Sequence, residues 1–499
     1  MVTATGINDA QWVTRLLHGV LTAVAAVLLS AALPRAHAQT DFLPVSVARA
    51  LAQADIPEHA AAFYVHEIGA ERPLLAAGAA RPMNPASSIK LVTTYAALEL
   101  LGPAFQWVTE AYAAGTLSDG VLEGDLVLKG RGDPKLTLEN FWLLLRGLRS
   151  RGLREIRGDL VLDRTYFAAT DHDPARFDEQ PTRPYNTGPD ALLVNFKAVR
   201  LLFVPDSEAR RVQILAEPAL PQVQIVNRLK LVDGPCGDWV NRLKVDAQGG
   251  SAATRLAFSG RYAASCGERA RSYSVLPHAH YVLGLFRELW RELGGTFSGT
   301  VRDGAVGADA RLIASVESPA LAQVVRDMNK FSNNVMARQL YLTLGAEAQG
   351  EPATREKADR VIREWLAGKR LNFPEMVLEN GSGLSRVERI SARHLGELLL
   401  SSFRSPVMPE FVASLPLAAM DGTMKKRLTD ADVAGQAHIK TGSLTGVRSI
   451  AGYMLDARGR RWVVVSIVNH PNAGNAQAAQ DALLTWIYHR GESACCPGG

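Results

Sequence analysis

The chain has 499 residues, with 55 Lys and Arg against 50 Asp and Glu, a formal charge of +5, and 47% hydrophobic residues. This is the composition of an ordinary globular protein, and its length predicts more than one domain around an ample core. Basic residues are not interleaved with aromatic ones and no zinc-type spacing occurs, which argues against a nucleic-acid-binding module. The mild positive charge suits an anionic polymer, but equally no special partner.

The N-terminus has the pattern of an export signal. Residues Gly19 to Leu33 are almost wholly apolar, follow Arg15, and lead to Ala36-His37-Ala38, a small-residue cleavage pattern. A transmembrane anchor is the alternative, but the apolar run falls short of the roughly 20 residues that span a bilayer. We therefore expect residues 1–38 to be a signal peptide. The long stretch before Arg15 leaves open a start codon further in.

The run Pro85 to Lys90 carries the first chemical motif. It stands before an apolar stretch with helical spacing that ends at Gly102, so we expect a buried helix that opens near Ser87. Ser87 and Lys90 are then three residues apart on one face, and a lysine kept neutral can take the proton of a serine nucleophile. Alone the match is weak, since such a pair arises by chance about once in a chain this long.

Residues 106–274 are dominated by β signals. The strand-like runs are Leu201–Val204, Val212–Leu215 and Val223–Asn227. Cys236 and Cys266 lie here, and we expect a disulfide between them, which would add roughly 3 to 4 kcal/mol of stability. The other two cysteines are adjacent in residues 491–499, a Ser, Pro and Gly tail that we expect to be disordered.

Two further motifs follow in order. Ser332-Asn333-Asn334 falls between two helical patterns and is typical of an inter-helix turn. Lys440-Thr441-Gly442 closes a short apolar segment and precedes Val447 to Leu455 and Trp462 to Val468, which predicts a strand followed by a two-stranded hairpin. A lysine on an edge strand, followed by small residues, lets an extended peptide lie close to the backbone.

The three motifs together resemble those of the penicillin-recognising serine peptidases, Ser-x-x-Lys, Ser-Asp-Asn and Lys-Thr-Gly. The chain departs from the pattern at Asn333, where Asp is usual. The interval from Ser87 to Ser332 is far longer than in class A β-lactamases and is similar to that of the class C D-alanyl-D-alanine carboxypeptidases, which carry a large insert there. Gly130–Pro134, Gly158–Asp163 and Asn380–Ser385 also look like that family.

This resemblance implies an α/β (α+β) fold. An antiparallel sheet covered by helices would form the peptidase domain from residues 39–105 and 275–490. Residues 106–274 would form a mixed, β-rich insert of two smaller domains, one nested in the other.

The resemblance also assigns the chemistry. Ser87 would attack a D-alanyl-D-alanine bond, Lys90 would act as general base, and Ser332 would relay a proton to the leaving amine. The backbone N–H groups of Ser87 and Ser443 would bind the oxyanion.

The substrate-binding residues implied are Asn334 for the peptide amide, and Lys440, Thr441, Gly442 and Ser443 around the terminal carboxylate. Each has a plain structural alternative: a helix N-cap for Asn334, a turn hydroxyl for Ser332, and a solvated edge-strand lysine for Lys440. No histidine has a convincing catalytic setting.

The expected protein is thus a periplasmic D-Ala-D-Ala carboxypeptidase, and an endopeptidase cutting cross-links by the same acylation is left open. Its partners would be peptidoglycan peptides and β-lactam antibiotics, with no cofactor, metal, nucleic acid or transmembrane anchor, and the oligomeric state is unknown. A β-lactamase and a non-catalytic peptidoglycan-binding protein of the same fold are the alternatives.

Overall fold

The structure is a computed structural model that describes residues 42–250, 253–429 and 431–490. The expected signal peptide, residues 1–38, and the expected disordered tail, residues 491–499, lie outside these ranges. Within them, no helix combines the length and the apolar character needed to cross a bilayer.

A four-stranded antiparallel sheet forms the centre of one domain. Its order is β1-β19-β18-β17, and its strands are β1 (Ala61–Glu67), β17 (Ala437–Leu444), β18 (Val447–Leu455) and β19 (Arg461–Asn469). Strand β19 is buried on both faces, because Val463 and Val465 belong to one hydrophobic core and Val464 to the other. Successive side chains of a strand point to opposite faces, so the continuous apolar run of β19 is what a two-sided sheet requires.

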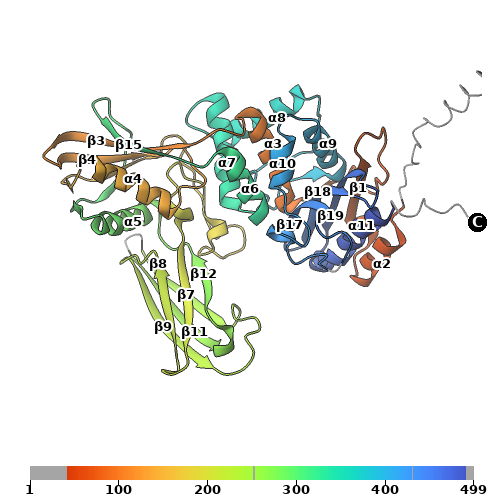
Figure 1. Cartoon of the computed structure of the whole chain (residues 1–499), viewed down its shortest axis with the longest axis horizontal. Coiled ribbons are helices and arrows are strands. Elements are labelled where there is room, and N and C mark those ends of the chain that lie inside the picture. The colour runs from red at the N-terminus through yellow and green to blue at the C-terminus, as the bar shows by residue number, and fades with distance from the viewer. Residues whose placement is uncertain (1–41, 251–252, 430, 491–499) are drawn as a thin grey trace, which may run out of the picture.

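Helices cover both faces of this sheet (Figure 1). Helices α2 (Val45–Gln53) and α11 (Gln477–His489) complete one core. The other core contains residues of α3 (Lys90–Leu100), α6 (Leu321–Phe331), α7 (Asn334–Gln349), α8 (Arg355–Gly368), α9 (Ala392–Phe403) and α10 (Met408–Ser414). A short pair of strands, β2 (Pro82–Met83) and β16 (Ile390–Ser391), joins the segment before α3 to the segment before α9. The predicted antiparallel sheet covered by helices is therefore confirmed.

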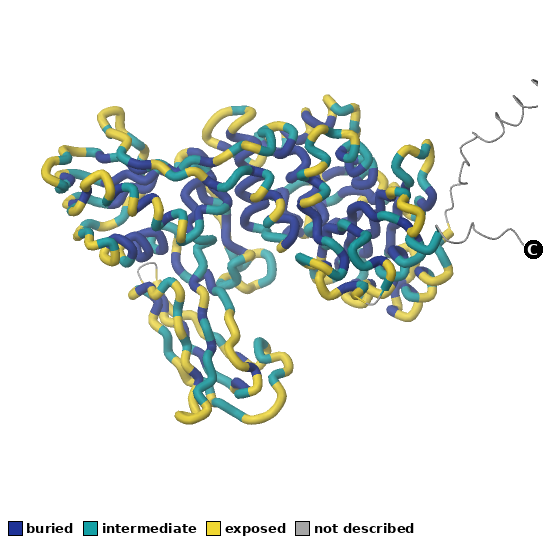
Figure 2. Tube along the Cα trace, in the orientation of Figure 1, coloured by how far each residue is buried: buried dark blue, intermediate teal, exposed yellow. Residues whose placement is uncertain are grey.

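A second domain is built on a seven-stranded mixed sheet. Its strands are β3 (Val108–Ser118), β4 (Val121–Lys129), β5 (Glu155–Ile156), β6 (Leu160–Asp163), β13 (Thr296–Phe297), β14 (Val301–Asp303) and β15 (Arg311–Glu317). Helices α4 (Leu138–Ser150) and α5 (His278–Glu292) contribute to its core. This core is separate from the cores on the two faces of the four-stranded sheet, and Figure 2 shows the buried stretches of the chain in both domains.

The insert ends later than we expected. Strand β15 pairs with β3 in antiparallel register from Arg311 to Glu317, and α5 packs into the same core as β4. Residues 275–317, which the sequence analysis gave to the peptidase domain, therefore lie in the insert. The cause is a pairing between strands about two hundred residues apart, which no local pattern reveals.

A smaller arm, residues 199–273, is nested within the second domain and projects from it (Figure 1). It consists of two three-stranded sheets, β12-β7-β8 and β10-β11-β9. Their strands are β7 (Val199–Asp206), β8 (Arg211–Glu217), β9 (Val223–Val232), β10 (Leu243–Gly249), β11 (Thr254–Ala263) and β12 (Arg269–Tyr273). A disulfide joins Cys236 to Cys266, the pair expected from the sequence, and ties the end of β9 to the end of β11.

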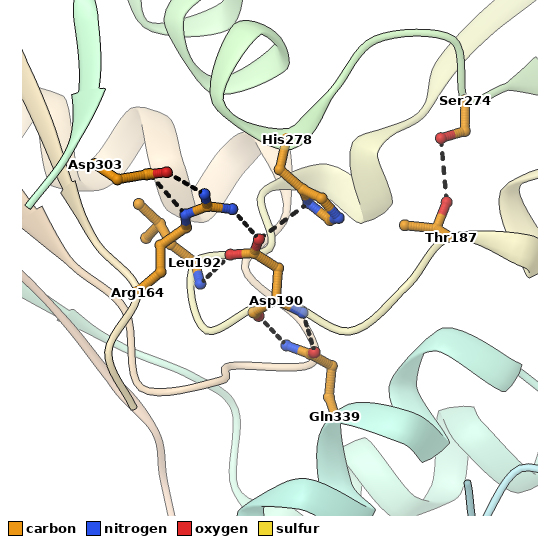
Figure 3. A network of polar contacts seen from close by, with 8 residues as sticks. All are labelled: Arg164, Thr187, Asp190, Leu192, Ser274, His278, Asp303 and Gln339. Atoms are coloured by element: carbon orange, nitrogen blue, oxygen red, sulfur yellow. Dashed lines mark hydrogen bonds and ion pairs between the residues drawn. The ribbon is translucent and has the colours of Figure 1, made fainter. Parts of the chain in front are cut away.

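A buried polar network holds the insert against helix α7 (Figure 3). The backbone N–H of Asp190 donates to Gln339 Oε1 at 2.9 Å, and Gln339 Nε2 donates back to the carbonyl of Asp190 at 2.8 Å. The Asp190 carboxylate accepts from Arg164 Nη1 at 2.5 Å and from the N–H of Leu192 at 2.9 Å. Because α7 begins at Asn334, this network fixes the insert to a helix that carries a candidate site residue.

We predict that Asp190→Ala lowers the free energy of unfolding by about 3 kcal/mol or more, since it strips a buried carboxylate from Arg164 and from a backbone donor. Urea denaturation measures the loss. Asp303→Ala is the matched control, because Asp303 binds the same arginine but is exposed, and we expect it to cost less than about 1 kcal/mol. Equal losses in the two variants would contradict this role for Asp190.

Candidate active site

Ser87 lies in a tight turn held by two asparagines. A 3₁₀ helix, Ala86–Ile89, precedes α3, so the expected helix at Ser87 begins as a 3₁₀ turn. Ala86 has φ of 45°, an unfavourable conformation for a residue with a side chain. Asn84 Oδ1 accepts from the Ala86 N–H at 2.9 Å, and the N–H of Asn84 donates to Asn469 Oδ1 at 2.8 Å. Surrounding contacts therefore hold the strained turn that presents Ser87.

Strand β17 runs directly against this turn. A Cβ atom on Gly442 would lie 2.6 Å from the carbonyl oxygen of Pro85 and 3.0 Å from the Ser87 nitrogen. Ser449 on the neighbouring strand donates to the Pro85 carbonyl at 2.6 Å and lies 2.8 Å from Ser88 Oγ. Only glycine allows the approach that brings the Lys440 strand beside Ser87.

Lys90 is fully buried at the base of the site. Its Nζ lies 3.0 Å from Ser87 Oγ and 2.6 Å from Asn334 Oδ1, and it also contacts the carbonyl oxygen of Ser382. Burial, followed by the nearby positive charge of Lys440, holds the pKa of Lys90 well below its usual range. A lysine that loses its proton this readily can serve as a base for the serine it contacts.

The middle motif forms the turn between α6 and α7, as predicted. Ser332 closes α6 in a left-handed conformation, with φ of 56°. Asn333 caps α7, because its Oδ1 accepts from the N–H groups of Val335 and Met336 at 3.0 and 3.1 Å. The N-cap role weighed for Asn334 thus belongs to Asn333, and an Asn oxygen meets this need as an Asp oxygen would. Asn334 is left free to point toward Lys90.

Lys440 is not the solvated edge-strand lysine weighed as an alternative. Although β17 is an edge strand, the side chain is fully buried and its Nζ contacts Ser332 Oγ at 2.8 Å and the Thr441 carbonyl at 2.7 Å. Burial lowers the pKa of Lys440 to about 7. The site therefore holds two lysine–serine pairs, Lys90 with Ser87 and Lys440 with Ser332.

The second pair adjoins a cavity of about 720 Å³ through Ser332. Ser332, Asn334 and Ser443 line it, together with Asp178 and Arg386, which the sequence analysis missed. Thr441 lies nearby and donates to Thr423 Oγ1 at 2.7 Å. Asp178 comes from the insert, and it accepts from Tyr185 Oη and Asn186 Nδ2, each at 2.7 Å. No local sequence motif identifies Asp178 or Arg386 as a site residue, because only the tertiary fold brings them to the cavity.

The glycine-rich segment Asn380–Ser385, one of the runs that resemble the family, forms a wall behind Ser87. Its Ser382 carbonyl is a partner of Lys90, and a Cβ on Gly383 would lie 2.1 Å from the carbonyl oxygen of Ala86. Both Gly381 and Gly383 have positive φ, so the segment needs its glycines.

Glu388, a third residue that the sequence did not reveal, organises this wall. Its buried Oε1 accepts from three consecutive backbone N–H groups, those of Glu379, Asn380 and Gly381, at 3.0 to 3.2 Å. Burial raises the pKa of Glu388, while the three donors and Lys90 oppose that rise. In return the carboxylate favours the protonated form of Lys90. Glu388 is therefore a positioning residue that also sets how readily Lys90 loses its proton.

The described residues contain no group of three or more His, Cys, Asp or Glu side chains that could hold a metal ion.

Comparison with known proteins assigns the family. The model of the D-Ala-D-Ala carboxypeptidase 3 (S13) family matches residues 43–489. The chain belongs to this family. A D-alanyl-D-alanine carboxypeptidase of Actinomadura sp. is 30% identical over 414 residues, which cover 80% of this chain and 76% of that protein. The D-alanyl-D-alanine carboxypeptidase DacB of Haemophilus influenzae is 25% identical over 398 residues, which cover 79% and 82%.

The fold agrees with this assignment. The crystal structure of penicillin binding protein 4 (dacB) from Haemophilus influenzae matches with a TM-score of 0.74 at 24% identity, over 89% of this chain and 100% of that chain. The family resemblance, the fold class and the serine-type D-Ala-D-Ala carboxypeptidase predicted from three short motifs are therefore confirmed.

We predict that Glu388→Gln moves the acid limb of the pH profile of kcat/KM to lower pH. Gln keeps an acceptor for the three backbone donors but removes the negative charge, so Lys90 loses its proton at lower pH and works as a base there. D-alanine release from a soluble pentapeptide, followed against pH, measures the shift. Glu379→Gln is the control, since Glu379 is a neighbouring carboxylate on the same stretch of chain. A similar shift in both variants, or no shift in Glu388→Gln, would contradict an effect of the Glu388 charge on Lys90.

Proposed function

We propose that Ser87 is the nucleophile of this carboxypeptidase and that Lys90 is its general base. The observation that carries the proposal is the set of three partners around Lys90 Nζ. Two of them, Asn334 Oδ1 and the Ser382 carbonyl, are acceptors that have no proton to give. A neutral amine has two hydrogens and one lone pair, so it can donate to both acceptors and direct the lone pair at the Ser87 hydroxyl.

Acylation then transfers one proton from Ser87 to Lys90 and one proton to the leaving amine. Ser87 Oγ attacks the carbonyl carbon of the terminal D-alanyl-D-alanine bond while Lys90 takes its proton. The tetrahedral intermediate collapses, the C–N bond breaks, and the leaving amine receives a proton. That proton is the one that Lys90 took from Ser87, and Ser332, 2.8 Å from Lys440 Nζ, is suited to relay it, which returns Lys90 to its neutral form. The products are an acyl-enzyme on Ser87 and free D-alanine, and water later hydrolyses the ester.

The terminal carboxylate of the substrate is proposed to bind where Lys440 and Thr441 meet. Lys440 is a buried cation beside the cavity, and a bound carboxylate would raise its pKa above the value of about 7 that burial alone produces. Thr441 Oγ1 and Ser443 add hydroxyl groups at the same edge. Asn334 Nδ2 can donate to the peptide carbonyl, because the Oδ1 of this residue is already taken by Lys90.

The oxyanion is proposed to lie between the backbone N–H groups of Ser87 and Ser443. Support comes from the close approach of β17 to the turn, which sets Gly442 against the Ser87 nitrogen. Each such donor contributes about 3 kcal/mol in the transition state of acyl transfer.

β-Lactam antibiotics are proposed as covalent inhibitors that acylate Ser87. A structure of the Haemophilus influenzae penicillin binding protein 4 holds a β-lactam, and that protein shares the fold of this chain. Family membership further supports peptidoglycan stem peptides as substrates and the periplasm as the place of action. An endopeptidase activity on cross-linked peptides would use the same acylation.

We predict that Lys90→Gln lowers kcat/KM for D-alanine release from a soluble pentapeptide by about a thousandfold, the usual contribution of a general base. Ser87→Ala abolishes release, and intact mass finds a penicillin adduct on the wild type alone. Release of D-alanine is compared with cleavage of a cross-linked dimer to separate the two peptidase activities.

Three results would contradict the proposal. They are activity on neither peptide, an adduct that survives Ser87→Ala, and rapid turnover of nitrocefin, which would favour a β-lactamase. Arg360→Gln, a change of an exposed residue on α8, controls for handling of the variants.

A further inference from the structure

One face of the sheet β10-β11-β9 in the arm is strongly basic. In the strand register, Lys244 and Arg228 flank Ser259 on either side, and Arg261 lies beside Lys230. Residues paired in this way, and those two apart along a strand, share a face. The charged residues of this basic face are the cations Arg228, Lys230, Lys244, Arg255 and Arg261, and the single carboxylate Asp246.

The basic face is exposed, whereas the opposite face is core. All five cations are exposed, while Leu256, Phe258 and Tyr262, which alternate with them along β11, are buried. The apolar side chains of β11 therefore lie on the core face of the sheet, and the cations lie on the face that is open to solvent.

Nothing in the described part of the chain neutralises these charges. None of the five cationic side chains forms an ion pair with a described residue, and Asp246 accepts from Gln248 Nε2 instead. On the other sheet of the arm, by contrast, Arg200 pairs with Glu217 at 3.1 Å. The basic face is thus not a network of internal salt bridges.

Four of the five charges are close enough to act together, whereas Arg255 lies four residues further along the sheet, opposite Gln224 and Gln248. Neighbouring strands lie about 4.8 Å apart, and residues two apart on a strand are about 6.7 Å apart. These spacings fall within the Debye length of about 8 Å at physiological ionic strength. A face of this kind attracts a partner that carries several negative charges in a row more strongly than a single anion.

The arm is rooted at the rim of the catalytic cavity. Ala198, which directly precedes β7, and Ser272 on β12 both line the cavity that adjoins Ser332 and Asn334. Figure 1 shows the arm projecting away from this root. A polymer whose end occupies the cavity can therefore extend along the arm.

We infer that the basic face binds the carboxylate-bearing stem peptides of a peptidoglycan strand adjacent to the peptide being cut. The inference rests on the proposed function, which makes the substrate part of such a polymer. The face carries no aromatic side chain on which nucleic-acid bases could stack, and it has no exposed large apolar side chain that could enter a bilayer. Carboxylates on a hydrated polymer are the partner that this face fits.

The test compares two charge-matched pairs of substitutions in the full-length Ser87→Ala protein, which cannot consume the polymer. Arg228→Gln with Arg261→Gln removes two cations from the basic face, and Arg311→Gln with Arg360→Gln removes two exposed cations elsewhere. Co-sedimentation with insoluble peptidoglycan measures binding. We expect the first pair to weaken binding about fivefold and the second to leave it unchanged, with the difference lost at about 1 M salt.

Catalysis distinguishes this inference from the proposed function. With Ser87 intact, the Arg228→Gln and Arg261→Gln protein should release D-alanine from a soluble pentapeptide at the wild-type rate but from insoluble peptidoglycan more slowly. Wild-type protein inactive on the pentapeptide would overturn the proposed function. Normal pentapeptide hydrolysis with equal sedimentation of both pairs would overturn the basic-face inference alone.

The chemistry of the partner has its own control. Peptidoglycan whose carboxyl groups have been converted to amides should lose the arginine-dependent part of the binding. Unchanged binding to the amidated polymer would overturn the inference. So would arginine-dependent binding to vesicles of anionic phospholipid or to polyphosphate with none to peptidoglycan.

Discussion

The contact of a buried lysine amine with a serine hydroxyl, Lys90 with Ser87, is the interaction on which the proposed chemistry depends. A lysine in water is protonated at neutral pH and cannot act as a base. The pKa of Lys90 is held well below the usual lysine value because the side chain is fully buried and because Lys440 adds a positive charge nearby. The cost of burying it is offset by Asn334 and the Ser382 carbonyl, which accept its hydrogens. The same contacts leave Ser87 as the partner that can give up a proton.

Much of the fold serves to bring these partners together. Ser87 lies in the 3₁₀ turn before α3 and Lys90 begins α3. Asn334 begins α7, Ser382 lies in a glycine-rich wall and Lys440 lies on an edge strand. None of the last three is close in sequence to Ser87. The insert also contributes to the site. The backbone of Asp190 forms two hydrogen bonds with Gln339 on α7, and Asp178 lines the cavity. The insert is therefore a part of the site as well as an appendage to the peptidase domain.

The sequence predicted what local spacing can encode. The Ser87–Lys90 pair, the turn at Ser332 and the hairpin of β18 and β19 all follow from periodicity over a few residues. It could not predict the pairing of β15 with β3, which moved residues 275–317 into the insert, or the Asn84–Asn469 bond across 385 residues of chain. Glu388 was missed for the same reason, because its donors and Lys90 meet it only in the folded protein.

The protonation of Lys90 is tested most directly by the pH dependence of the rate at which benzylpenicillin acylates Ser87, followed by intact mass in the wild-type protein. If Lys90 is the buried base described above, the rate reaches its plateau at a pH well below 10.5, the ordinary lysine value. A rate that keeps rising until ordinary lysines lose their protons would contradict the account, and so would a rate independent of pH.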